Sequence, residues 1–218
     1  ASNENGLLEK VKPEVNKERI EKFHRYALSV EGGYDNVKGD RGGETKYGIT
    51  KEVARSYGYK GSMKDLPLDF AKDVYTKRYY DKNRLGEIKD DRVALSVFDW
   101  SLNSGAWAVK KLQQTLNKMN GNNDLAVDGI IGKHTLEAVN KANPEELLKN
   151  LHSSQHKFYD NIVKNDPSQK KFLAGWHNRV DRKEAFIKKE FEAAKPKSLS
   201  EAKKEATTVV KQAPQNQK

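Results

Sequence analysis

Two carboxylates in one glycine-rich stretch, Glu31 and Asp40, are the side chains of this sequence best suited to act together in catalysis. The stretch reads EGGYDNVKGDRGGETKYGIT over residues 31–50. Two carboxyl groups on either side of a sugar linkage can protonate the leaving oxygen and direct water, or stabilise the positive charge that develops. The glycines allow a sharp bend and let a bulky substrate approach the backbone. The stretch therefore predicts acid–base hydrolysis of a glycoside.

Glu31 is the predicted general acid. It follows an amphipathic helix that should end at the glycine pair 32–33 and whose apolar stripe consists of Ile20, Phe23, Ala27 and Val30. The negative end of the helix dipole and partial burial would both raise the pKa of this carboxyl group. A carboxylic acid that is still protonated near neutral pH is what a glycosidase needs as its proton donor.

Asp40 is the predicted second carboxylate, because a chain that folds back beyond Glu31 can place the two groups opposite each other. If Asp40 directs water, its carboxyl should lie about 6.5–9.5 Å from that of Glu31. Thr45 could help to hold that water, or its hydroxyl could stabilise a hairpin. Two alternatives stay open: Asp40 could be a turn aspartate, and Glu44 could be the second carboxylate.

The aromatic rings of Tyr34 and Tyr47 are candidate substrate-binding surfaces, since both could stack on sugar faces. The alternative is that they pack the hairpin. Elsewhere, Trp107 and Trp176 are expected in the core or in the wall of a cleft rather than as ligand platforms.

The rest of the chain has helical periodicity almost throughout, which predicts a mainly α globule with a small glycine-rich hairpin at the site. The segment 93–102 is apolar on nearly all sides and predicts a central buried helix. Asn143, Pro144 and Glu146 form a strong helix start. Further helices are predicted over about 69–80, 106–119, 133–140, 144–165 and 172–191.

Four segments are expected along the chain. Residues 1–16 form a polar arm with Pro13 as a helix breaker, and residues 17–105 contain the predicted catalytic site. Residues 106–193 form a helical region that packs on the first. Residues 194–218 hold six Lys and two Glu, so they carry +4 of the net charge of +10, and they are expected to form a disordered basic tail.

Composition excludes several classes of protein. Charged residues make up 33% of the chain, and no apolar run approaches the about 18 residues of a membrane helix, so we expect no stable membrane insertion. The absence of cysteine excludes disulfides and thiol chemistry. The excess of positive charge suggests an anionic partner. Acidic residues are spread through the body and no recognition motif is present, so nucleic acid is not the expected partner.

No metal or organic cofactor is expected. His152 and His156 have a metal-like spacing, but no third ligand is evident, and a solvated polar face is the expected interpretation. The segment 120–131 begins like a calcium loop but has Leu125 and Ile131 where Gly and Glu are needed.

The motif EGGY…DRGGETKYGIT resembles the signature of the glycoside hydrolase family 108 muramidases. FDWSLNSG (98–105), LQQ (112–114), VDGIIG (127–132) and GWHNRV (175–180) resemble, in the same order, a companion region described as a predicted peptidoglycan-binding domain. The resemblance covers about residues 20–190. It implies a lysozyme-like helical fold, Glu31 as the catalytic acid, and Asn103 among the substrate-binding residues.

The order Glu–Asp–Thr also resembles phage-type lysozymes, which implies that Asp40 orients water and that Thr45 assists. This chain lacks the prolines and the first aspartate that family members often have before the glycine pair at 42–43. The resemblance implies a monomeric peptidoglycan hydrolase, an N-acetylmuramidase of the endolysin type. It would be made in the bacterial cytoplasm and act on the cell wall after release, or from a virion or after secretion. A non-catalytic wall-binding module is the alternative.

Overall fold

The computed structural model describes residues 2–36 and 43–192, and over these residues the protein is mainly helical with one small sheet. The mainly α fold with a glycine-rich hairpin is thus confirmed. The α-helices are α1 (Ser2–Val30), α2 (Lys51–Ser56), α3 (Leu68–Val74), α4 (Asp91–Ser104), α5 (Trp107–Asn120), α6 (Lys133–Lys141), α7 (Pro144–Asn165) and α8 (Lys170–Ile187). The strands are β1 (Tyr34–Asp35), β2 (Thr45–Lys46) and β3 (Ile49–Thr50).

Two of the helices continue in a wider form. A π-helical segment, Tyr75–Asp81, follows α3 directly, and a π-helical turn, Lys188–Glu192, follows α8. Single turns of 3-10 helix occur at Met63–Asp65, Leu85–Glu87 and Pro167–Gln169. The sequence predicted one helix over 69–80, and the change to π geometry within it was not foreseen.

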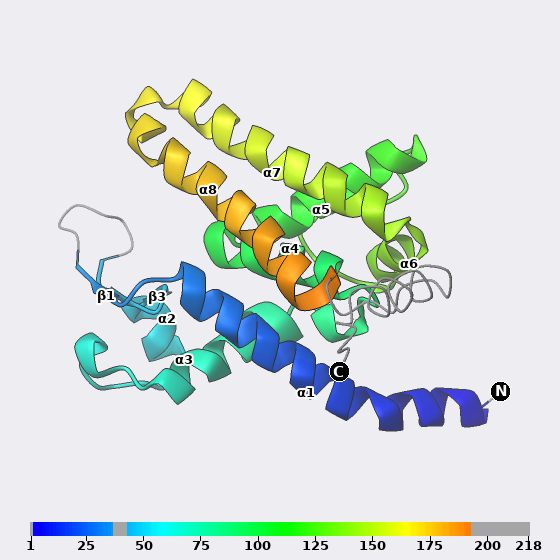
Figure 1. The fold of residues 1–218 in the computed structure, drawn as a ribbon, viewed down its shortest axis with the longest axis horizontal. Coiled ribbons are helices and arrows are strands. Elements are labelled where there is room, and N and C mark those ends of the chain that lie inside the picture. The colour runs from blue at the N-terminus through cyan, green and yellow to red at the C-terminus, as the bar shows by residue number, and fades with distance from the viewer. Residues whose placement is uncertain (1, 37–42, 193–218) are drawn as a thin grey trace, which may run out of the picture.

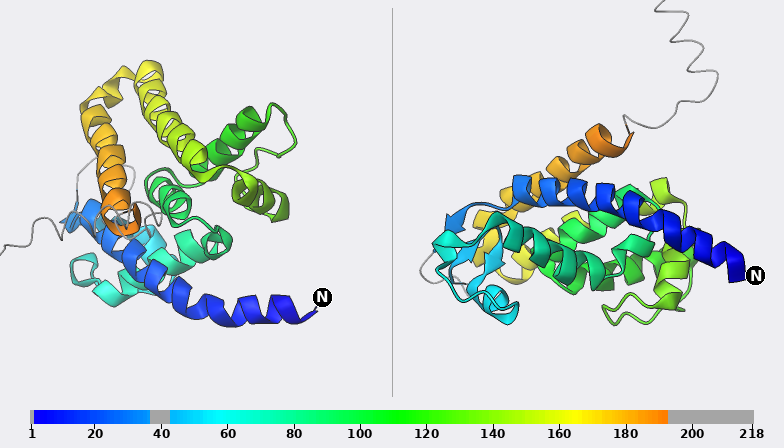
Figure 2. Two further views of the ribbon diagram at one scale, coloured as in Figure 1. Left: turned by 45° about the vertical axis from the view of Figure 1, so that its right-hand side comes forward. Right: turned by 90° about the horizontal axis from the view of Figure 1, so that it is seen from below.

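Helix α4 lies at the centre of the molecule, with the long α1 on one side and the antiparallel pair α7 and α8 on the other (Figure 1). The small sheet stands at the C-terminal end of α1, and Figure 2 shows the same arrangement from two further directions. Every residue of α4 from Arg92 to Ser101 is buried, as the apolar pattern predicted. Asp90 caps the helix by accepting hydrogen bonds from the backbone N–H groups of Arg92 and Val93.

The predicted start of α7 is also confirmed. Asn143 Oδ1 accepts a hydrogen bond of 3.0 Å from the backbone N–H of Glu146, and Pro144 occupies the first helical position, where its missing N–H has no cost. The helix ends before Pro167, whose ring cannot continue it.

The prediction for the N-terminal arm was wrong in one respect. Helix α1 begins at Ser2 and passes through Pro13 without ending there. A proline inside a helix removes one backbone hydrogen bond and bends the axis, but the turns on either side can keep their own hydrogen bonds. Figure 2 shows α1 curving along its length.

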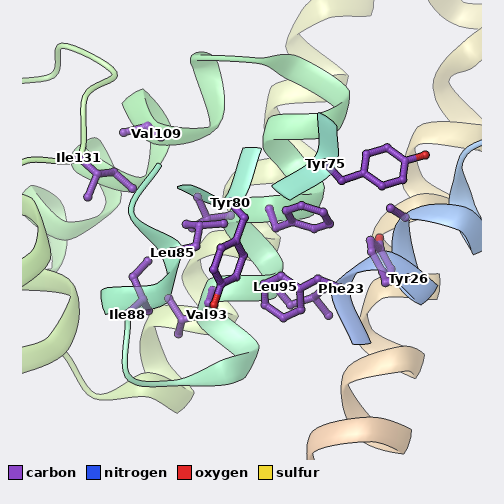
Figure 3. Close-up of a cluster of buried hydrophobic side chains, with 14 of the residues drawn as sticks. Phe23, Tyr26, Tyr75, Tyr80, Leu85, Ile88, Val93, Leu95, Val109 and Ile131 are labelled. Carbon is purple, nitrogen blue, oxygen red and sulfur yellow. The ribbon is translucent and has the colours of Figure 1, made fainter. Parts of the chain in front are cut away.

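One continuous hydrophobic core joins both halves of the described chain. It extends from Phe23 of α1 through Leu95 of α4 to Leu151 of α7 and Ile187 of α8, all of them buried. Phe23 packs edge-on against Tyr80 of the π-helical segment, with ring centroids 5.6 Å apart. Figure 3 shows this cluster. The core therefore fixes the end of α1, and with it Glu31, relative to α4 and α8.

Candidate active site

Glu31 lies immediately after the last turn of α1, and its backbone N–H still donates to the carbonyl of Ala27 at 2.8 Å. Its side chain is only 17% exposed, so the carboxylate is held by the protein and yet open to solvent on one side. The glycine pair 32–33 then leads the chain into β1. This is the position that the sequence predicted for the general acid.

The turn between β2 and β3 closes one side of this carboxylate. A methyl group built on Gly48 would lie 2.6 Å from the carboxyl carbon of Glu31, so any larger residue there would displace the carboxylate. Tyr47 and Gly48 both have positive φ, 53° and 75°, which is the geometry of a two-residue type I′ hairpin turn. Tyrosine rarely adopts this conformation. The Tyr75 hydroxyl, from the π-helical segment, donates to the Tyr47 carbonyl and helps to hold the turn.

Arg179 of α8 pairs with Glu31 from the opposite side. Its Nη2 donates to Glu31 Oε1 at 2.9 Å, and its Nε donates to Asp99 Oδ1 at 2.8 Å. A guanidinium is planar and presents several N–H groups in fixed directions, which lets it bridge two carboxylates. This contact therefore joins the Glu31 carboxylate to the buried Asp99 and limits the directions in which it can point.

Asp99 is the fully buried anchor of this arrangement. Burial alone would raise the pKa of its carboxyl group, but the charges of Lys183 and Arg179 and hydrogen bonds from Tyr26 and Gln155 lower the pKa to about 2. Lys183 Nζ lies 3.2 Å from Asp99 Oδ2, and both side chains are 0% exposed. Asp99 therefore carries a negative charge inside the core, and that charge fixes Arg179 beside Glu31.

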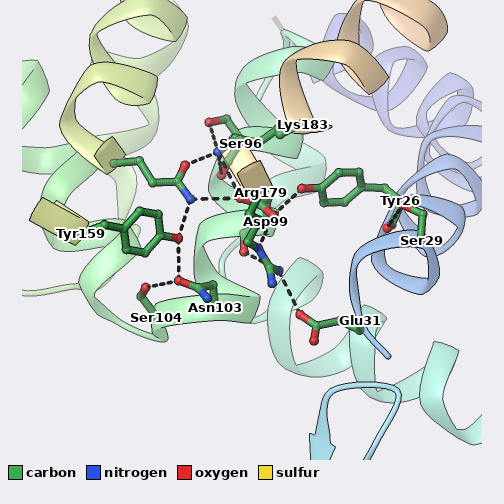
Figure 4. Close-up of polar contacts among 11 residues, drawn as sticks. Tyr26, Ser29, Glu31, Ser96, Asp99, Asn103, Ser104, Tyr159, Arg179 and Lys183 are labelled. Carbon is green, nitrogen blue, oxygen red and sulfur yellow. Dashed lines mark hydrogen bonds and ion pairs between the residues drawn. The ribbon is translucent and has the colours of Figure 1, made fainter. Parts of the chain in front are cut away.

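The polar network continues from Asp99 to Asn103 (Figure 4). Gln155 of α7 donates from Nε2 to Asp99 Oδ2 at 3.1 Å and to the Tyr159 hydroxyl at 3.0 Å. The Tyr159 hydroxyl in turn donates to Asn103 Oδ1 at 2.6 Å. A chain of hydrogen bonds thus joins Asn103, one of the predicted substrate-binding residues, to Glu31.

The remaining predicted residues lie on the sheet. The Tyr34 hydroxyl donates to Glu44 Oε2 at 2.7 Å, and Lys64 Nζ lies 5.3 Å from the Tyr34 ring centroid. Glu44 is also 3.7 Å from Lys51 Nζ, so its carboxylate has a structural partner on each side. Thr45 pairs with Asp35 and Thr50 in the two ladders of the sheet, close in sequence to the Tyr47 turn. These contacts fit the hairpin-packing interpretation of Tyr34.

Asp40, the predicted second carboxylate, lies outside the described residues. Its separation from Glu31 therefore stays a prediction.

The prediction of a solvated face at His152 was wrong. This side chain is 6% exposed and lies between α7 and α8, where its Nδ1 is 3.1 Å from Glu184 Oε1. The residue falls on the inner face of α7, one turn after the buried Leu148. His156 instead stacks on His177, with the two Nδ1 atoms 2.6 Å apart. Among the side chains that the structure describes, residues 16–36 and 43–192, no three of His, Asp or Glu gather as a possible metal site.

The sequence argument did not single out Asp99 and Arg179. A signal for Asp99 was present, because a charged residue within an almost wholly apolar helix must find a charged partner when it is buried. The partner could not be named from the sequence, since Arg179 lies 80 residues away.

Comparison with known proteins gives two adjoining family matches. Residues 24–105 match the family Glycosyl hydrolase 108, and residues 107–181 match the Predicted Peptidoglycan domain. A solved structure described as "Structure of Brucella abortus SagA" superposes with a TM-score of 0.65 and 29% sequence identity, over 78% of this chain and 95% of that chain. A comparison with curated protein sequences gives no match.

The matches cover both parts of the site. The first contains Glu31, the hairpin and Asp99, and the second contains Gln155, Tyr159 and Arg179. The resemblance noted in the sequence is therefore confirmed, and the lysozyme-like helical fold with it. Residues 24–105 are therefore a glycosyl hydrolase 108 domain, which makes the protein a glycoside hydrolase, and residues 107–181 are a predicted peptidoglycan domain, which gives peptidoglycan as its partner.

Proposed function

We propose that the protein is an N-acetylmuramidase, which hydrolyses the β-1,4 bond from N-acetylmuramic acid to N-acetylglucosamine in peptidoglycan. The observation that carries this proposal is the placement of Glu31. Its carboxylate is partly exposed, the Gly48 turn bounds it on one side, and a guanidinium anchored in the core fixes it on the other. A proton donor needs such a fixed position to reach one atom of a bound substrate.

In this proposal the Glu31 carboxylic acid gives its proton to the glycosidic oxygen of the leaving N-acetylglucosamine. The bond from C1 of N-acetylmuramic acid to that oxygen breaks, and water adds to C1 to create a new reducing end. Asp40 directs the water or stabilises the positive charge on the sugar ring, and Thr45 helps to hold the water. These two roles rest on the resemblance and on the order of the residues in the chain.

The product of digestion tests the specificity of the cut. Purified peptidoglycan is incubated with the protein, and the fragments are reduced and identified by mass spectrometry. Reducing-end N-acetylmuramic acid is expected. Reducing-end N-acetylglucosamine, or fragments cut at an amide bond, would contradict the proposal.

The Glu31→Gln variant tests the acid. The amide keeps the shape of the side chain but has no proton to transfer, so the rate should fall about 10²–10⁴-fold. Thermal unfolding and sedimentation with peptidoglycan should stay close to those of the unmodified protein. Loss of turbidity of a cell-wall suspension then measures lysis, the expected outcome of this activity on bacteria. If neither the unmodified protein nor the Glu31→Gln variant releases fragments, although both sediment with peptidoglycan, the chain is a wall-binding module.

A further inference from the structure

A second recess lies apart from Glu31, between α5, α7 and α8. Its volume is about 600 Å³, and four aromatic residues line it together with polar ones. The aromatic residues are Trp107, Phe158, Tyr159 and Trp176. We call this recess the aromatic pocket. Trp107 is 50% exposed, which is unusual for so large an apolar side chain. The sequence argument expected it in the core or in the wall of a cleft rather than as a ligand platform.

The aromatic rings form one connected wall. Trp107 and Phe158 have ring centroids 6.1 Å apart, and Tyr159 stacks on Trp176 at 5.3 Å with 20° between the ring planes. The Tyr159 hydroxyl is fixed by its hydrogen bonds with Gln155 and Asn103. These rings are therefore held in place before any ligand binds, so that binding would need little further ordering of side chains.

The polar side chains of the aromatic pocket suit an amino sugar. Asn103 Oδ1 accepts hydrogen bonds from the Tyr159 and Ser104 hydroxyls, at 2.6 and 2.8 Å, so its Nδ2 is the group that it can offer to a ligand carbonyl. Asn161 and Asn165 add amide groups, which can both donate and accept. Flat apolar rings beside amide side chains match a pyranose with an apolar face, hydroxyl groups and an acetamido substituent.

The charge around the pocket is positive, which suits binding of the anionic polymer peptidoglycan. Lys111 lines the pocket, and Lys110 Nζ lies 4.8 Å from the Trp107 ring centroid. The lactyl groups and stem peptides of peptidoglycan carry carboxylates, which these ammonium groups would attract. A purely apolar partner would gain nothing from these lysines and would leave the asparagines without hydrogen bonds.

A chain of hydrogen bonds also connects the pocket with Glu31. Asn103 lies one helical turn after Asp99 on α4, and the hydrogen bonds from Asn103 through Tyr159 and Gln155 end at the carboxylate that fixes Arg179. Eight of the ten lining residues fall within the predicted peptidoglycan domain, 107–181. We infer that the aromatic pocket is a second glycan-binding site, which holds an N-acetylated amino sugar of the strand that is cut at Glu31. This inference rests on the proposed function for the identity of the strand.

Binding is measured in the Glu31→Gln background, so that the ligand is not consumed. The probe is soluble glycan strands freed of stem peptides by an amidase, titrated by calorimetry. Trp107→Ala should weaken binding about tenfold, because an exposed aromatic platform is lost. Trp107→Phe should restore most of the affinity. Leu68→Ala is the matched control, since Leu68 on α3 is 41% exposed and does not line the pocket. Thermal unfolding verifies that each variant folds.

Equal affinities of the Trp107→Ala and Leu68→Ala proteins would overturn the inference. A loss that appears only with strands that still carry stem peptides would assign the pocket to the peptide and overturn the sugar assignment. The proposed function is tested separately, by the reducing ends that the protein with Glu31 intact releases. Binding that depends on Trp107 without such products would refute the muramidase and leave the glycan site standing.

Discussion

At Gly48 the backbone passes so close to Glu31 that one added methyl group would displace the carboxylate. Gly48→Ala should therefore lower kcat by about 10²-fold, the cost of moving a catalytic group by about 1 Å. The substitution also places alanine at a φ of 75°, which should lower the free energy of unfolding by about 1–2 kcal/mol. Turnover of soluble glycan and urea unfolding measure the two effects.

Gly121→Ala is the matched control for this change. Gly121 has a φ of 67° at the end of α5, and a methyl group there would have no atom within 4 Å. It should show the same loss of stability with normal turnover. Equal turnover of the two variants would mean that the hairpin turn does not position Glu31.

The residues of the site differ in how far the sequence could predict them. Glu31 could be placed at the helix end because its signal is local: an apolar stripe, a glycine pair and a carboxylate at the end of the stripe, whereas its role as the acid stays a prediction. Arg179 was not found, because its ion pair with Glu31 spans 148 residues and leaves no trace in either segment. Asn103 was implied only by a family motif, and the structure links it to Glu31 through Tyr159, Gln155 and Asp99.

Helices α1, α4 and α8 meet at Asp99. Substitution of this residue therefore tests how the packing of the three helices depends on its charge. Asp99→Asn keeps the shape but leaves Lys183 and Arg179 without their buried counter-charge. The free energy of unfolding should fall by about 3–5 kcal/mol. Adding Lys183→Met should recover part of that loss, because it removes one uncompensated charge. If the Asp99→Asn protein is as stable in urea as the original protein, the ion pairs of Asp99 contribute nothing to stability.

His152 makes the packing of α7 on α8 sensitive to acid. Burial, and then the charge of Lys183, lower the pKa of His152 from 6.5 to about 3. The neighbouring charged or titratable groups are Lys183 and Glu184 of α8, Asp99 of α4 and His156 of α7. Within the described part of the chain, His152 Nε2 is buried and has no hydrogen-bond partner. Protonation would therefore create a buried N–H group that has no acceptor.

Protonation of His152 should destabilise the fold, because its pKa is 6.5 in the unfolded chain and about 3 in the folded protein. Between pH 6.5 and about 3 the unfolded chain is protonated at His152 and the folded chain is not. Each unit of acidification below 6.5 should therefore lower the free energy of unfolding by about 1.4 kcal/mol at this residue. Unfolding in urea at several pH values measures the slope. His152→Gln should have a shallower slope, and an unchanged slope would contradict the assignment.

Among the elements, those with local signals were predicted well. The helix cap at Asn143 and the apolar run of α4 are each determined by residues within a few positions of one another. The π-helical segment Tyr75–Asp81 was missed, because a helix with one extra residue in a turn keeps almost the same apolar spacing. The passage of α1 through Pro13 was missed as well, since proline lowers the stability of a helix without forbidding it.

On the scale of the whole molecule, the sequence could predict two helical regions but not how they share a site. Glu31 directly follows α1, whereas the guanidinium beside it comes from α8, and one core runs beneath both helices. Such contacts depend on the packing of elements distant in the chain, which periodicity does not encode. Among the described residues, no helix has the length and apolar character needed to cross a membrane.

The net charge of +10 predicts how the whole molecule meets its substrate. Cell walls carry phosphates and carboxylates, so a cationic protein is attracted to them before any specific contact forms. Residues 194–218 contribute +4 of this charge and few apolar side chains. Attraction of this kind has no defined geometry, and salt screens it over a Debye length of about 8 Å at physiological ionic strength.

A chain that ends after Glu192 isolates the contribution of these residues. Its turnover of soluble glycan should equal that of the longer chain, because Glu31, Arg179 and the aromatic pocket are all retained. Its binding to whole cell walls should be weaker at low salt and should converge with that of the longer chain at high salt. A pelleting assay across a salt series measures this. Equal binding at low salt would show that residues 194–218 do not contribute, and a lower melting temperature would show instead that they stabilise the folded body.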